Sequence, residues 1–150
     1  MKIYKAYGAQ TIDTVSADPY QLEGDIPDIG FLTADRIARA LGVPFDAPAR
    51  IAASMSYVLE LAANEGHAYL PFTVLVERAA GLLGMPQNDA DDMLRLRLHE
   101  GRGLVRERVK TESGKLGLVV YLGYLYRAEV NLAAGLRSLA GGQTDRLWQF

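Results

Sequence analysis

The sequence predicts a mostly α protein with one small β-hairpin, and three observations lead to this fold class. Apolar residues recur at helical spacing through most of the 150 residues. Residues 104–122 instead alternate between apolar and polar side chains around the turn sequence TESG, as two antiparallel strands do. Gly and Pro fall between these segments, where they would end one element before the next begins.

The first third of the chain is predicted to form two short helices, a tight connection and a longer helix. Gly8 separates the first two helices, and Asp18-Pro19 ends the second. The connection EGDIPDIGF is rich in Gly, Asp and Pro, and Gly42 is a suitable C-terminal cap for the longer helix. The expected helices are residues 1–7, 9–16 and 32–41. Together they predict a helix-hairpin-helix region over residues 1–45.

A second region is predicted to begin at the sequence VPFDAP, where two prolines bracket Asp46, a suitable helix cap. Its expected elements are helices 47–65, 72–83 and 89–100, an extended link HAYLPF, strands 104–110 and 115–122, and a helix 124–139. Three helices followed by a hairpin predict a winged helix-turn-helix. The expected fold is therefore a helix-hairpin-helix region, a winged-helix-like domain over residues 46–140 with a C-terminal helix, and a tail over residues 141–150.

The composition excludes several classes of function. The chain has no Cys, which excludes a disulfide scaffold, a thiol nucleophile and the common zinc sites. Its two histidines lie far apart in the sequence, and Asp89, Asp91 and Asp92 suit a helix N-terminus better than a metal site. We therefore expect no metal and no cofactor. With 49% hydrophobic residues, no signal peptide and no apolar stretch that spans a bilayer, a soluble cytoplasmic chain without membrane contact is expected.

The sequence IPDIGFLTADRI resembles the helix-hairpin-helix motif, which holds a DNA phosphate on backbone amides. Gly30 allows close approach of a phosphate to the free amides of the following helix, and Gly8 is a second candidate backbone contact. However, Asp28 replaces the first Gly of the motif, and Leu32 stands where many DNA-binding members have Lys. Residues 1–46 carry a net charge of −3, from four basic and seven acidic residues. Both DNA contact and a purely structural hairpin remain open.

Basic residues gather in residues 94–115, where seven of them stand against three acidic residues. Arg95 and Arg102 are spaced to share one face of the third helix, if that helix extends past Gly101, and Lys110 and Lys115 flank the expected wing tip. We take these four as the candidate DNA-binding side chains. The alternative is that Arg106 and Arg108 are only the solvent side of an alternating strand. Since the whole chain has a net charge of −2, any DNA contact must be local.

The string YGAQTIDTVSADPYQLEGDIPDIGFLTADRIARALGV resembles the N-terminal region of RecD-like DNA helicases, the exodeoxyribonuclease V alpha-subunit-like family. Further similarities are Arg50-Ile51, Gly66-His67, Tyr69-Leu70-Pro71 and Glu129, so the resemblance covers about residues 4–139. It implies a superfamily 1 motor that unwinds DNA 5' to 3' with ATP, in DNA repair or recombination. The tail would then lead towards a motor domain that the 150 residues do not contain.

No sequence of the form G-x-x-x-x-G-K-[ST] occurs in the chain. The one Gly-Lys pair, Gly114-Lys115, is followed by Leu116 and has Val109 at the place of the first Gly. We therefore predict a DNA-binding accessory region without enzymatic activity, with single-stranded or junction DNA and the motor domains of the helicase as partners. The alternative function is a protein-interaction module that docks onto the motor domains, or onto another repair subunit, without DNA contact. The acidic first region favours this alternative.

Overall fold

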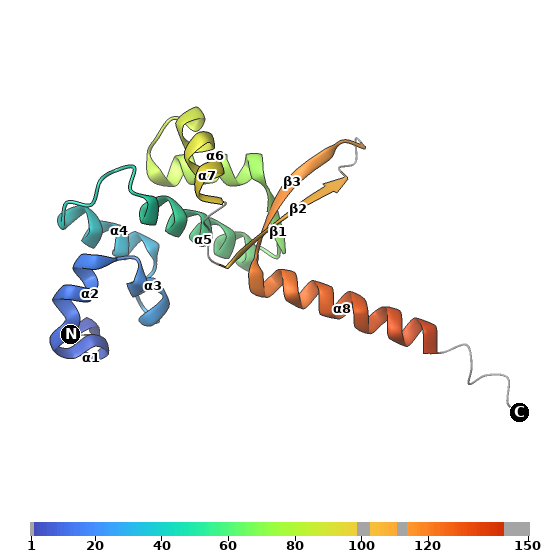
Figure 1. Cartoon of the computed structure of the whole chain (residues 1–150), viewed down its shortest axis with the longest axis horizontal. Coiled ribbons are helices and arrows are strands. Elements are labelled where there is room, and N and C mark those ends of the chain that lie inside the picture. Colours follow the sequence, from blue (N-terminus) through green and yellow to red (C-terminus); the bar gives the residue numbers. More distant parts are fainter. Residues whose placement is uncertain (1, 99–102, 111–113, 143–150) are drawn as a thin grey trace, which may run out of the picture.

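A computed structural model of the chain describes residues 2–98, 103–110 and 114–142. These residues form eight α-helices, one 3-10 turn and a three-stranded antiparallel sheet, and the last helix extends away from the rest (Figure 1). The predicted fold class, mostly α with a small β-hairpin and a C-terminal helix, is confirmed. The hairpin and the N-terminal helices lie at opposite ends of the body, with α5 between them (Figure 1).

The N-terminal region contains α1 (Lys2–Tyr7), a 3-10 turn η1 (Gly8–Gln10), α2 (Thr11–Ala17), α3 (Gln21–Asp25) and α4 (Phe31–Ala40). The break between α1 and α2 depends on Gly8, whose φ of +56° lies in the left-handed region. The Gly8 carbonyl accepts a hydrogen bond from Thr11 Oγ1 at 2.7 Å. The second helix therefore begins at Thr11 and not at Ala9, because the 3-10 turn takes up the three residues before it.

Helix α3 was not expected from the sequence, which predicts only a connection there. Its first turn is held by Asp18, whose Oδ1 accepts a hydrogen bond from the Tyr20 amide at 3.0 Å. Leu22 anchors it in the core with 1% of its surface exposed. The helical pair around the hairpin is thus α3 and α4, and the hairpin itself is residues 26–30, with Ile26 and Ile29 buried.

A buried ion pair joins the hairpin region to α5 (Pro48–Asn64). Arg50 of α5 is 2% exposed, and its guanidinium donates to Asp35 of α4 at 2.8 and 3.1 Å and to the Phe45 carbonyl at 3.0 Å. The Tyr20 hydroxyl also donates to Asp35, at 2.7 Å. Burial opposes ionisation of Asp35, but the hydrogen bonds from Arg50 and Tyr20 hold its pKa below the usual value. The two predicted regions therefore pack as one body around a common core.

The remainder of that core is built by α5, α6 (Phe72–Leu83) and α7 (Gln87–Leu98) against one face of the sheet. The strands β1 (Tyr69–Pro71), β2 (Leu104–Lys110) and β3 (Leu116–Leu122) lie in the order β1-β3-β2. Val120 of β3 pairs with Leu70 on one side and Arg106 on the other, and it is fully buried. The segment predicted as an extended link is therefore an edge strand.

Helix α8 (Gly123–Gly142) begins at a close contact between two glycines. The Gly123 amide donates to the Gly103 carbonyl at 2.7 Å, and a Cβ on Gly123 would lie 2.7 Å from the same oxygen. Only glycine therefore fits this position without a shift of the β2 backbone. No helix in the described part of the chain is long and apolar enough to cross a membrane.

Candidate nucleic-acid interface

A groove of about 440 Å³ lies between α7 and the β2–β3 hairpin. Three arginines line it together with one acidic and two apolar side chains, which are Arg95, Arg106, Arg108, Glu107, Leu98 and Leu118. The groove is thus rich in guanidinium groups, which donate hydrogen bonds to phosphate oxygens in a fixed fork.

The strand register explains why two of these arginines meet α7. Arg106 pairs with Val120 and Arg108 pairs with Leu118, and directly paired residues of antiparallel strands point to the same face. That face carries the buried Val120 and packs on the core. Arg106 and Arg108 are exposed, as the alternating pattern predicted, but they lie on the core side of the sheet, where they face α7.

Arg95 enters the groove from α7 and is held by two neighbours. Its guanidinium is bound to Asp91 one helical turn earlier, with a distance of 3.1 Å between Nη2 and Oδ1, and lies 4.5 Å from the centre of the Phe72 ring. The hydrogen bonds that Arg95 donates to Asp91 raise the pKa of Arg95, so the side chain stays charged. Asp91 also offsets part of that charge.

The hairpin offers a different environment at Gly30, the N-cap of α4. Gly30 has φ −91° and ψ 176°, which is extended backbone, and a Cβ there would meet nothing within 4 Å. No non-glycine residue has a positive φ in the described chain, so Asp28 does not adopt the left-handed conformation that a Gly at this place can supply. The backbone of the hairpin therefore accommodates Asp28 at the place where the motif has Gly, and Gly30 is open to solvent.

The carboxylate of Glu23 in α3 is directed at this helix end. The backbone of Phe31, the first residue of α4, stabilises the charged carboxylate, as a phosphate would be stabilised at the same place. Burial, and then repulsion by Glu60 of α5, nevertheless raise the pKa of Glu23 to about 7. Its Oε1 is buried without a hydrogen-bond partner among the described residues. The α4 N-terminus thus already faces an acidic group of the protein itself.

Comparison with known proteins agrees with the hairpin geometry. Residues 1–69 match the family described as the HHH domain of the ATP-dependent RecD2 DNA helicase. This part of the chain is therefore similar to a RecD2-type helix-hairpin-helix domain. The chain is also 32% identical over 143 residues to the ATP-dependent RecD2 DNA helicase of Deinococcus radiodurans. This alignment covers 90% of the chain and 19% of that helicase. The predicted resemblance to a RecD-like helicase region is confirmed, and the chain spans about a fifth of this relative's length.

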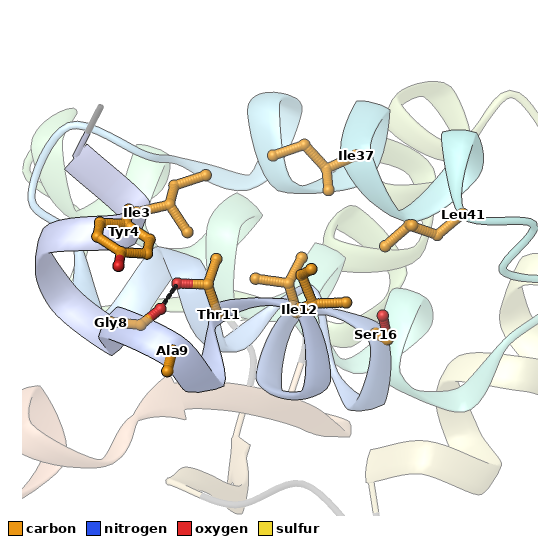
Figure 2. Close-up of a pocket in the computed structure, with 10 residues that line it drawn as sticks. Ile3, Tyr4, Gly8, Ala9, Thr11, Ile12, Ser16, Ile37 and Leu41 are labelled. Atoms are coloured by element: carbon orange, nitrogen blue, oxygen red, sulfur yellow. Dashed lines mark hydrogen bonds between the residues drawn. The ribbon is translucent and has the colours of Figure 1, made fainter.

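Within residues 1–69, Gly8 lines a different surface from Gly30. It lines an apolar groove of about 540 Å³ between α1, α2 and α4, together with Ile3, Ile12, Ile37 and Leu41 (Figure 2). Figure 2 shows the Gly8 carbonyl bound to the Thr11 hydroxyl. Because the surroundings are nearly all apolar, they suit a side chain of a protein better than a phosphate.

Of the other predicted DNA-binding residues, Lys110 lies near the groove arginines and Lys115 does not. Lys110 ends β2 on the same face as Arg106 and Arg108, whereas Lys115 is exposed just before β3 and does not line the groove. Arg102, and the helical face it was predicted to share with Arg95, lie outside the described residues. In the described ranges, no group of three or more His, Cys, Asp or Glu side chains could hold a metal ion.

Proposed function

We propose that this chain is a DNA-binding accessory region of a RecD-like, ATP-dependent 5' to 3' DNA helicase that acts in DNA repair or recombination. The observation that carries the proposal is the arginine-lined groove between α7 and the β2–β3 hairpin. The order α5-β1-α6-α7-β2-β3 matches a winged helix, in which the third helix and the wing commonly contact DNA. The RecD2-type domain that precedes it supports a helicase context.

The contacts in this proposal are to the phosphate backbone. Arg106 and Arg108 supply positive charge from β2, and Arg95 supplies a guanidinium that is oriented by Asp91 and Phe72. Lys110 extends the same face towards the wing, and Lys115 and Arg102 are further candidate contacts. Gly30 is left as a weaker backbone contact, because Glu23 faces the same helix end. Single-stranded or junction DNA is the proposed ligand, since the sequence of the bases is not needed for such contacts.

In this proposal the chain has two parts with different roles. The helix-hairpin-helix region, residues 1–45, positions the winged-helix-like region, residues 46–140, and residues 141–150 lead towards the motor domains. ATP hydrolysis belongs to the motor of the cytoplasmic helicase, because the chain contains no phosphate-binding loop of the G-x-x-x-x-G-K-[ST] type.

Fluorescence anisotropy with single-stranded, duplex and forked oligonucleotides tests the proposal. The double variant Arg106→Ala with Arg108→Ala should lower affinity on every substrate. Because each lost phosphate contact removes roughly 0.7–0.9 from the slope of log affinity against log salt, that slope should also fall by up to about 1.8. Arg137→Ala on the exposed part of α8 is the control, and it should leave both quantities unchanged. Equal binding by the wild type and the double variant at low salt would overturn the proposal.

A further inference from the structure

Helix α8 carries a stripe of leucines that, beyond Leu125, the rest of the described chain does not cover. Leu125, Leu132 and Leu139 are seven residues apart, and Leu136 lies one turn after Leu132. Leu132 is 64% exposed, Leu136 57% and Leu139 71%. Side chains of this size exposed together on one helix face are typical of an interaction surface.

The start of the stripe is fixed to the body of the protein. Leu125 packs against the hydrophobic core, and the ring of Tyr126 lies edge-on to Tyr121 of β3, with centroids 5.2 Å apart. The contact between Gly103 and Gly123 fixes the first residue of the helix to the residue just before β2. The stripe is therefore held in a defined direction from the sheet, as Figure 1 shows for α8.

The spacing of the leucines indicates that the partner is a helix. A seven-residue repeat keeps one seam facing a second helix that winds around the first. Between the leucines, the seam positions are occupied by the small residues Ala128 and Gly135. A Cβ at Gly135 would meet nothing within 4 Å. The seam can therefore accept large apolar side chains from a partner at these two positions.

The charges beside the stripe indicate which side chains flank the partner's apolar face. Glu129 lies about 60° around the helix from Leu132, whereas Arg127 and Arg137 are each about 140° away, at 100° per residue. A second carboxylate, Glu107 of β2, accepts a hydrogen bond from the Tyr121 hydroxyl at 3.3 Å. Burial, and then the negative charges of Glu107 and Glu129, raise the pKa of Tyr121 to about 12, so both acids act on this one hydroxyl. The body end of the stripe is thus acidic.

A second copy of the chain in a parallel pair fits this seam poorly. In a symmetric parallel pair, Glu129 of one helix would face Tyr124 of the other, and neither Asn131 nor Ser138 at the equivalent positions carries a positive charge. Ala128 would face Ala128, and Gly135 would face Gly135, which leaves gaps in the seam. A different helix, with large apolar and basic side chains, satisfies both positions.

We propose that α8 is a docking site for an amphipathic helix of another protein segment, with leucine-type residues on its apolar face and Lys or Arg beside them. The site shares Glu107 with the lining of the arginine groove, but its leucine seam lies on α8, which does not line that groove. A basic side chain of the partner pairs with Glu129 and Glu107, while its apolar side chains fill the seam at Ala128 and Gly135. The partner also buries the leucines that water now contacts.

Two synthetic helical peptides test this proposal by isothermal titration calorimetry with the whole chain. Both carry the same leucine seam, and the flanking positions are Lys in one and Glu in the other. The Lys peptide should bind at least about tenfold more tightly than the Glu peptide, and Glu129→Lys with Glu107→Lys should reverse that order. Leu132→Ser with Leu136→Ser should abolish binding of both peptides. Val130→Ser, a change of an exposed apolar residue about 160° from Leu132, is the matched control and should change nothing.

Three results would overturn the proposal. Binding of neither peptide to the folded wild type, verified by circular dichroism, would remove the docking site. Equal affinity for the two peptides would show that Glu129 and Glu107 do not select a basic partner. A concentration-dependent dimer of the chain in light scattering that Leu132→Ser with Leu136→Ser dissolves would identify a second copy as the occupant.

Discussion

The hairpin at Gly30 and the groove at Arg106 are both places where the sequence predicts phosphate contact, but their electrostatics differ. At the hairpin, the end of α4 faces the carboxylate of Glu23, and Asp28 is exposed next to it. In the groove, three guanidinium groups stand against Glu107. A helix N-terminus supplies about half an elementary charge, whereas each arginine supplies a full one. A motif can thus keep its backbone shape while the charge that attracts DNA lies elsewhere in the chain.

The difference extends to the ion pairs of the two regions. The Asp35–Arg50 pair of the hairpin region is buried and joins α4 to α5, whereas the Asp91–Arg95 pair of the groove is exposed on one helix. Buried pairs are costly to break because the remaining charge is left without a partner, and exposed pairs contribute little to stability. The hairpin region is therefore held to α5 by an arginine with a structural role, whereas the groove presents its paired arginine to solvent.

The largest expected effect tests this contrast. Asp35→Ala should lower the free energy of unfolding by about 3 kcal/mol, because it leaves the Arg50 guanidinium buried and unpaired. Asp91→Ala, the same change in the exposed pair, should lower it by less than about 0.5 kcal/mol. Urea denaturation of the two variants measures both values. Similar losses in the two variants would show that the pairs have the same role.

The second effect concerns charge reversal and DNA affinity. Arg108→Glu in the groove should weaken binding to a single-stranded oligonucleotide about tenfold or more, because it replaces an attraction to phosphate by a repulsion. Arg36→Glu, on the exposed side of α4, changes the net charge by the same amount and should weaken binding by less than about threefold. Anisotropy titrations in one buffer compare the two. If Arg36→Glu had the larger effect, the hairpin region would be the principal DNA contact.

The third effect is a pH dependence that arises in the hairpin region. The pKa of Glu23 is raised to about 7 in the folded protein from an ordinary value of 4.5. Its contribution to stability is therefore complete below about pH 4.5 and is lost as the pH rises through 7. Glu23→Gln should remove this dependence and raise the free energy of unfolding at pH 8 by about 1 kcal/mol, a value reduced for partial exposure. Urea denaturation at pH 5 and pH 8 measures the free energy of unfolding of both proteins. If this free energy changed between the two pH values by the same amount in Glu23→Gln as in the wild type, Glu23 would not be the source of the pH dependence.

The smallest effect is expected at Asp28. Asp28→Gly should strengthen DNA binding by no more than about twofold, because the carboxylate is exposed and screened while Glu23 still faces the helix end. Asp28→Asn removes the charge without adding a glycine, so it separates the two contributions. An increase of tenfold or more in Asp28→Gly would mean that the hairpin holds a phosphate as in the motif.

Local sequence patterns were sufficient for some elements and not for others. The bounds predicted for α6 and β2 agree with the structure, since their apolar periodicities are regular. Helix α3 is only five residues long and contains Gly24, so it depends on the Asp18 hydrogen bond and the burial of Leu22. Strand β1 depends on pairing with β3 about 50 residues later, which no local pattern contains.

The same distinction applies to the candidate site. The basic cluster was predicted from composition, but the direction of Arg106 and Arg108 was not, because it depends on which face of β2 meets the core. The position of Glu23 at the end of α4 depends on how α3 and α4 pack. In the alternation through LVRERVK, Leu104 shares one face with the two arginines and Val105 shares the other with Val109, so both faces carry apolar residues and the pattern does not decide which face meets the core.

The central claim is that the groove, and not the hairpin, is the main DNA contact. Amide chemical-shift perturbation in a ¹⁵N-labelled chain, titrated with a short single-stranded oligonucleotide at low salt, tests it most directly. The claim predicts the largest shifts in residues 95–98, 104–110 and 116–118, with little change at the amides of residues 31–33. Large shifts at residues 31–33, with an unperturbed groove, would contradict it.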